Sequence, residues 1–170
     1  MEKERGMTIL IDTREQAPFD FLACGADIST ERAALPIGDY SLAGLADRVA
    51  VERKSLPDLV QCLGADRGRF ERELLRAAAL DAFCVVVETG WHDLAEGRYR
   101  SRLEPGAACA SVGAFMARYH IPFFFAGSRE QAERFTALFL RQWLKGKVHD
   151  LDAMRQAVEE NAGLNRRRRT

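Results

Sequence analysis

The sequence predicts an α/β protein with a central mixed β-sheet flanked by α-helices, and three observations support this fold class. The short apolar runs 7–12, 83–87 and 121–125 have the length and composition of buried strands. An alanine-rich helical segment separates the last two runs, and a segment with the apolar spacing of an amphipathic helix follows them. Strands that alternate with helices are typical of a partly parallel sheet covered by helices.

Further extended segments are expected early in the chain. The strand over 7–12 ends in polar residues, as a strand does where it leaves a sheet. Pro36 and Gly38 interrupt the next stretch and divide it into two extended segments. With the strand that follows, these segments are expected to form a hairpin-like unit at one side of the sheet. The segments of this unit are 26–35, 38–43 and 48–54.

The remaining elements are expected to be helices. Ser55 has the form of an N-cap, with Asp58 three positions further on. Phe70 and Leu74 lie on one stripe of the next helix, and Ser128 begins a Ser-x-x-Gln capping box. The expected helices are 55–63, 69–80, 106–119, 128–144 and a short one at 150–161.

Length and composition restrict the class of protein. The 170 residues fit one ordinary domain, with 25 Lys plus Arg against 25 Asp plus Glu, so a surface that is basic throughout is excluded. No apolar stretch is long enough for a membrane span, and the charged N-terminus is not a secretory signal, so we expect a cytoplasmic protein. The four cysteines include no C-x-x-C pair and are expected to be reduced and packed.

The segment 38–58 contains the residues best suited to chemistry. Asp39 begins one extended segment, and the alternation of the next strand places Glu52 and Lys54 on the same face. Asp39 and Glu52 offer the hard oxygen ligands that Mg²⁺ or Mn²⁺ prefers. Lys54 is suited to orient an attacking water and to offset charge on a phosphate. This combination is the chemistry of metal-assisted phosphodiester hydrolysis.

The alternative for Glu52 and Lys54 is a solvated charged face on an edge strand. The choice of lysine favours the chemical interpretation. Between residues 4 and 144 there are 17 basic side chains, and 16 of them are arginine. A lysine changes its pKa more readily than an arginine, so Lys54 is a candidate for a role that arginine cannot fill.

The motifs of this segment resemble those of the XPF-type nuclease domain, whose signature is GD…ERKxxxD. The chain has GDY at 38–40, ERKSLPD at 52–58 and GRFERE at 68–73. The stretch IDTRE at 11–15 is similar to the first-strand motif of that family, D-x-R-E. The resemblance covers about residues 7–144.

The resemblance implies a restriction-endonuclease-like core that cuts branched DNA, or DNA at junctions between single and double strands, with Mg²⁺ or Mn²⁺. Such enzymes serve DNA repair or recombination. The domain would span 1–144, and 145–170 would be a short helix with a basic tail. The residues carried over as catalytic are Asp12, Asp39, Glu52, Arg53, Lys54 and Asp58, with Asp12, Asp39 and Glu52 as metal ligands; Glu15 is a weaker candidate. Asp58 also has its interpretation as a helix cap, and Arg53 is expected to point away from the metal, in a supporting or DNA-binding role.

Arginines are the candidates for DNA contacts. Arg14 belongs to the first-strand motif, and the helix at 69–80 carries a basic side that fits a phosphate backbone. A salt-bridged helix face remains the alternative there, as a solvated terminus does for the tail. The candidates are Arg14, Arg67, Arg69, Arg72, Arg76, Arg166, Arg167, Arg168 and Arg169. A homodimer or a heteromeric partner is also expected, and the alternative function is a non-catalytic DNA-binding or pairing module.

Overall fold

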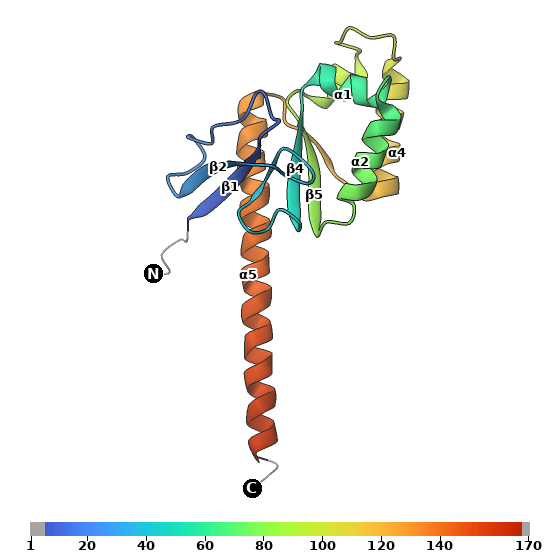
Figure 1. Cartoon of the computed structure of the whole chain (residues 1–170). Helices are drawn as coiled ribbons and strands as arrows, with labels where there is room; N and C mark the ends of the chain where they lie inside the picture. The colour runs from blue at the N-terminus through green and yellow to red at the C-terminus, as the bar shows by residue number, and fades with distance from the viewer. Residues whose placement is uncertain (1–5, 168–170) are drawn as a thin grey trace. The chain divides into compact units, whose positions relative to one another are not determined.

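The computed structural model describes residues 6–167. Within this range a six-stranded sheet has the order β2-β1-β3-β4-β5-β6 (Figure 1). The strands are β1 (Met7–Asp12), β2 (Ile28–Ala33), β3 (Tyr40–Leu42), β4 (Val49–Lys54), β5 (Ala82–Val87) and β6 (Phe123–Phe125). The helices are α1 (Leu56–Leu63), α2 (Arg67–Ala77), α3 (Trp91–Ala95), α4 (Pro105–Tyr119) and α5 (Arg129–Arg167).

The sheet is mixed, as the sequence predicts. β1 pairs with β2 in parallel, β3 is antiparallel to both β1 and β4, and β5 and β6 continue parallel to β4. β1 and β4 therefore run in the same direction, and their carboxyl ends lie at one edge of the sheet. This arrangement brings residues at the end of β1 close to residues at the end of β4.

The expected hairpin-like unit is only half correct. β3 and β4 form the antiparallel pair, but β2 lies on the far side of β1 and does not contact β3 in the sheet. The chain crosses over after β1 and returns parallel to it, which a sequence pattern of short extended segments does not distinguish from a hairpin.

The two faces of β4 are covered by different elements. Ala50 belongs to a core shared with α1, α2 and α4, which gather on one side of the sheet in Figure 1. Val49 and Val51 are fully buried on the other face. Because side chains alternate along a strand, Glu52 and Lys54 follow Ala50 and Arg53 follows Val51. A central strand with both faces covered is not the solvated edge strand of the alternative interpretation.

Helix α5 is one continuous helix from Arg129, whereas the sequence suggested separate helices at 128–144 and 150–161. Gly146 alone does not end it, because a glycine in a helix costs only about 1 kcal/mol and no proline follows. The chain divides into two compact units within α5, one ending at Leu140 and one beginning at Arg141. Among the described residues, no helix combines the length and the apolar character needed to cross a lipid bilayer.

Candidate active site

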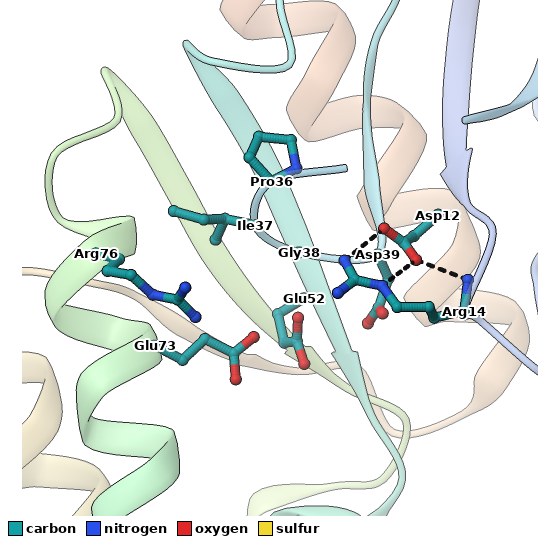
Figure 2. Close-up of a pocket in the computed structure, with 9 residues that line it drawn as sticks. All are labelled: Asp12, Arg14, Pro36, Ile37, Gly38, Asp39, Glu52, Glu73 and Arg76. Carbon is teal, nitrogen blue, oxygen red and sulfur yellow. Dashed lines mark hydrogen bonds and ion pairs between the residues drawn. The ribbon is translucent and has the colours of Figure 1, made fainter. Parts of the chain in front are cut away.

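A pocket of about 130 Å³ opens where the ends of β1 and β4 meet the helix α2 (Figure 2). Four carboxylic acids and two arginines line it, together with apolar residues of the loop before β3. The charged residues at its wall are Asp12, Arg14, Asp39, Glu52, Glu73 and Arg76. The pocket therefore gathers the three acids that the sequence proposed as metal ligands.

The glycine of the GDY motif is required by the approach of the chain to β4. Gly38 has φ +78°, and a Cβ there would lie 3.0 Å from both the Ala50 Cβ and the Val51 carbonyl oxygen. Only glycine tolerates this conformation and this contact. The next residue, Asp39, then donates its N–H to the Val51 carbonyl at 2.9 Å, and its carboxylate accepts the Arg53 N–H at 2.8 Å. The motif thus fixes the Asp39 carboxylate against the end of β4.

Glu52 and Lys54 form a buried ion pair at this end of β4. The Lys54 Nζ lies 2.5 Å from the Glu52 Oε1, and the Lys54 and Glu52 side chains are 14% and 7% exposed. Burial and the nearby Asp39 carboxylate raise the pKa of Glu52, while Lys54 opposes that rise. Burial would lower the pKa of Lys54, but the Glu52 carboxylate raises it above its usual value. Burial also raises the pKa of Asp39, to about 6.

Asp12 differs from the other two acids, because all its usual acceptor directions are occupied. Its carboxylate accepts the Arg14 N–H, the Arg14 Nε–H and Nη2–H, and the Leu35 N–H, each at 2.7 to 2.8 Å. The Arg14 guanidinium lowers the pKa of Asp12 to about 2. The Arg14 guanidinium therefore already supplies a positive charge to the Asp12 carboxylate.

The donor chemistry fits a divalent cation at Asp39 and Glu52. Each carboxylate has one oxygen that receives no hydrogen bond from the described residues, and both line the same pocket. The pKa values of both carboxylates are raised although Lys54 is nearby, so a further positive charge, which Mg²⁺ or Mn²⁺ would supply, would stabilise their ionised forms. Within residues 6–167, however, no three acidic, histidine or cysteine side chains are already grouped for an ion. Asp12 as a third ligand stays a prediction.

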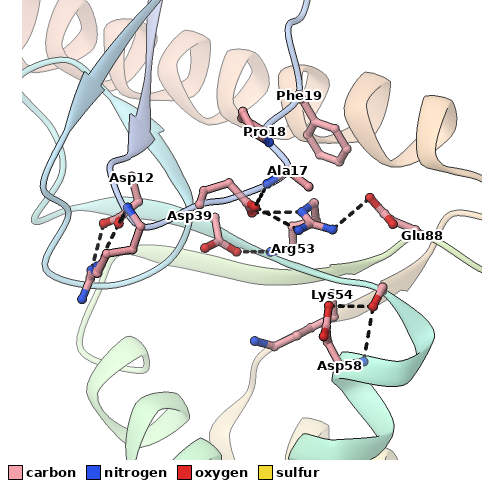
Figure 3. Close-up of polar contacts among 12 residues, drawn as sticks. Asp12, Ala17, Pro18, Phe19, Asp39, Arg53, Lys54, Asp58 and Glu88 are labelled. Atoms are coloured by element: carbon pink, nitrogen blue, oxygen red, sulfur yellow. Dashed lines mark hydrogen bonds and ion pairs between the residues drawn. The ribbon is translucent and has the colours of Figure 1, made fainter.

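Arg53 points to the opposite face of β4 and enters a polar network there (Figure 3). Its guanidinium makes two 2.9 Å hydrogen bonds to the Glu15 carboxylate and one of 3.1 Å to Glu88. Burial would raise the pKa of Glu15, but Arg53 lowers it. Arg129, at the start of α5, also pairs with Glu88 and donates to the Ala17 carbonyl. The Arg53 side chain is only 11% exposed, so the structure favours the supporting role over the DNA contact.

Asp58 lies outside the pocket, at the start of α1. Its backbone N–H donates to the Ser55 hydroxyl at 3.3 Å, and that hydroxyl donates to the Asp58 carboxylate at 2.6 Å. The cap that the sequence predicts is therefore present, and it accounts for the side chain. A catalytic role for Asp58 stays a prediction.

The arginines proposed for DNA binding fall into four groups. Arg67 donates to the Ser111 hydroxyl and pairs with Glu71, and Arg69 pairs with Asp66, so these two support the local structure. Arg14 is held by Asp12, with 73% of its side chain exposed. Arg72 and Arg76 make no hydrogen bond or ion pair with the described residues. Of the tail, Arg168 and Arg169 lie outside the described residues, as do the side chains of Arg166 and Arg167.

Sequence reasoning missed three residues of this region. Glu73 was noted as part of a motif and of the alternative salt-bridged helix face, yet it lines the pocket, and its charge contributes to raising the pKa of Glu52. Its three-residue spacing from Arg76 on a helix placed both on one side, which was the available signal. Glu88 and Arg129 meet only through tertiary structure, and no local pattern indicates that they pair.

Comparisons with known proteins agree with this fold. The family model described as the ERCC4 domain matches residues 11–139. The structure is similar to that of XPF from Aeropyrum pernix, with a TM-score of 0.60 and 22% sequence identity over 88% of this chain and 69% of that chain. This likeness confirms the predicted restriction-endonuclease-like fold. No curated protein shows significant similarity to the sequence.

Proposed function

Because the chain belongs to the ERCC4 domain family, a family of structure-specific nucleases, we propose that it is a Mg²⁺- or Mn²⁺-dependent DNA endonuclease. Its substrates would be flaps, forks or related branched DNA, of the kinds that arise in repair and recombination. The observation that carries the proposal is the buried Glu52–Lys54 pair beside Asp39, which a purely structural strand end does not require.

The residues in and beside the pocket have distinct roles in this proposal. Asp39 and Glu52 would hold the cation, which supplies charge neutralisation on phosphate oxygens and activation of water. Gly38 and the Arg53 N–H fix the Asp39 carboxylate, so that little rearrangement is needed when substrate binds. Lys54 does not itself line the pocket, but its ammonium pairs with Glu52 there. In this proposal it would orient the attacking water and donate to the phosphate.

The network behind β4 supports these groups. Arg53 is held on the far face by Glu15 and Glu88, and Arg129 ties Glu88 to the loop after β1. Because the backbone N–H of Arg53 contacts Asp39, the position of that carboxylate depends on this network. Positioning of this kind is worth a large part of the rate in sites that act mainly through preorganised charge.

The test is cleavage of flap, fork and four-way junction DNA by the purified chain with Mg²⁺ or Mn²⁺. We expect cleavage of at least one branched form and no cleavage in EDTA. The double variant Glu52→Ala with Lys54→Ala should be inactive, and Asp47→Ala, which changes an exposed acid outside the pocket, should be active. Activity that survives the double substitution would contradict the proposal.

The second candidate is a non-catalytic DNA-binding or pairing module. It is favoured by the hold of Arg14 on Asp12 and by the absence of a ready three-ligand group in the described part of the chain. Calorimetric titration with Mn²⁺ separates the two candidates. Absence of ion uptake without DNA, together with absence of cleavage, would support the module.

A homodimer, a heteromeric partner and a cytoplasmic location belong to the same proposal. Within the first unit, Leu138 is 52% and Phe124 37% exposed, and Phe124 stacks on Phe135. These apolar groups on β6 and the start of α5 support association with another chain. Light scattering that gave only monomer at high protein concentration would contradict the homodimer.

A further inference from the structure

The arginines that the sequence grouped on one helix side have different surroundings in the structure. Arg67 is tied to α4 through Ser111, and its guanidinium lies 4.7 Å from the centre of the Phe115 ring. Arg69 is held by Asp66 at 2.7 Å. Arg72 and Arg76 are exposed and make no hydrogen bond or ion pair with described residues. Of these four arginines, Arg76 alone lines the acidic pocket.

Arg76 faces the pocket across from the other arginine at its wall. Figure 2 shows Glu52 between Arg76, on α2, and Arg14, beside the end of β1. Arg14 gives its Nε–H and an Nη2–H to the Asp12 carboxylate. Arg76 makes no ion pair with Glu52 or Glu73, although both acids line the same pocket. Its five N–H donors are therefore available to a ligand.

The charges of the pocket indicate that the ligand of Arg76 is a backbone phosphate of DNA. A DNA strand that enters a pocket with four acids meets repulsion, which a cation offsets only at the phosphate it contacts. A neighbouring phosphate needs its own positive partner, and a guanidinium presents paired N–H groups that match two phosphate oxygens. An uncommitted arginine at the pocket wall supplies such a partner.

We propose that Arg76 binds the backbone phosphate adjacent to the scissile phosphate, on the α2 side of the pocket, and so sets the register of the strand over Asp39 and Glu52. The inference rests on the proposed nuclease function and adds a residue that touches the substrate without taking part in bond cleavage. Arg67 and Arg69, in contrast, support the helix itself.

The first test measures binding of a flap DNA at several salt concentrations with Ca²⁺ in place of Mg²⁺ or Mn²⁺, so that a cation is present at the acids while cleavage is suppressed. Each phosphate contact contributes a slope of about 0.9 for duplex DNA, or about 0.7 for a single strand, to the fall of log K with log salt. Arg76→Ala should therefore lower the slope by about 0.7 to 0.9, and Arg76→Lys, which keeps the charge, should restore most of it. A purely structural role for Arg76 would leave the slope unchanged.

Two control variants make this result specific. Arg134→Ala removes an exposed arginine of α5 that pairs with Glu130, outside the pocket, and should leave the slope at the wild-type value. Arg72→Ala removes the other uncommitted arginine of α2 and should change the slope less than Arg76→Ala. An equal change in the Arg72 variant, or an unchanged slope in the Arg76 variant, would overturn the assignment.

The second test uses cleavage kinetics. A contact that is equally strong in the ground state and the transition state raises KM when it is removed and leaves kcat nearly unchanged. We expect Arg76→Ala to raise KM about tenfold with kcat within about threefold of wild type; a main effect on kcat would contradict the proposed contact. If the wild-type chain binds DNA but does not cleave it, the proposed function fails while the salt slope still decides the role of Arg76.

Discussion

Replacement of Asp39 by asparagine should separate the stability of the fold from the proposed activity. The substitution keeps the size of the side chain and an oxygen that can accept the Arg53 N–H, which lies 2.8 Å from the carboxylate. It removes the charge. Burial raises the pKa of Asp39 to about 6, from about 3.9 in an unfolded chain, so the folded protein favours the protonated acid.

The sign of the effect follows from that direction. A pKa that is higher in the folded chain gives stability that is fully present below about pH 4 and is lost as the pH rises through about 6. A shift of about two units corresponds to about 3 kcal/mol, which we reduce to about 2 kcal/mol because the side chain is partly exposed. The asparagine amide does not ionise, so the variant should be more stable than wild type by about 2 kcal/mol at pH 7.5 and equally stable at pH 4.

The assay is urea unfolding in EDTA at the two pH values, with Asp47→Asn as a control that removes an exposed acid outside the pocket. Excess Mn²⁺ at pH 7.5 should then stabilise the wild-type chain and not the Asp39 variant, because a ligand that binds only the folded state shifts unfolding by mass action. The reasoning is refuted if Asp39→Asn is less stable than wild type at pH 7.5, or if the difference is the same at both pH values.

Three other substitutions probe the neighbouring groups. Arg14→Ala should cost about 1 kcal/mol of stability, since the Arg14 guanidinium is largely exposed. It should raise Mn²⁺ affinity about tenfold in calorimetry, because it removes a nearby positive charge and one of the two hydrogen bonds to each Asp12 oxygen. Weaker Mn²⁺ binding would speak against competition at Asp12. Arg53→Met should lower the free energy of unfolding by about 3 to 5 kcal/mol in urea, because it leaves Glu15 buried without its partner, and a loss under about 1 kcal/mol would contradict this. Lys54→Arg should lower the rate constant of single-turnover cleavage at least about 100-fold. Circular dichroism close to that of wild type would show that the fold persists. Full activity would contradict a role of Lys54 in proton transfer.

The fold could be predicted where local patterns determine the element. β1 and β5 are continuous apolar runs, and the structure has them as strands at nearly the expected residues. The Ser128 cap is also present, with its hydroxyl accepting the Gln131 N–H at 3.1 Å. The position of β2 in the sheet was not predictable in the same way. β2 is a six-residue edge strand that pairs with β1, and its sequence does not show whether its neighbour is β1 or β3.

In the candidate site too, the features that depend on local geometry were predictable and those that depend on tertiary contacts were not. Alternation along β4 correctly assigns Glu52 and Lys54 to one face and Arg53 to the other, since period-two geometry is local. The ion pair of Arg14 with Asp12 spans only two residues, but the Asp12 carboxylate also accepts the Leu35 N–H from another segment. Contacts of this kind follow from the assembled sheet and have no signature in sequence spacing.

The proposed hydrolysis gives a physical reason for a lysine at position 54 in a region rich in arginine. The ammonium lies 2.5 Å from the Glu52 Oε1 and 5.4 Å from the centre of the Phe70 ring. Burial lowers its pKa and the Glu52 charge raises it, so the proton affinity of Lys54 depends on how much negative charge Glu52 carries. Any change that withdraws charge from Glu52 therefore lowers the pKa of Lys54. A guanidinium in that place would keep its proton throughout, which leaves it able to neutralise a phosphate but unable to assist an attacking water.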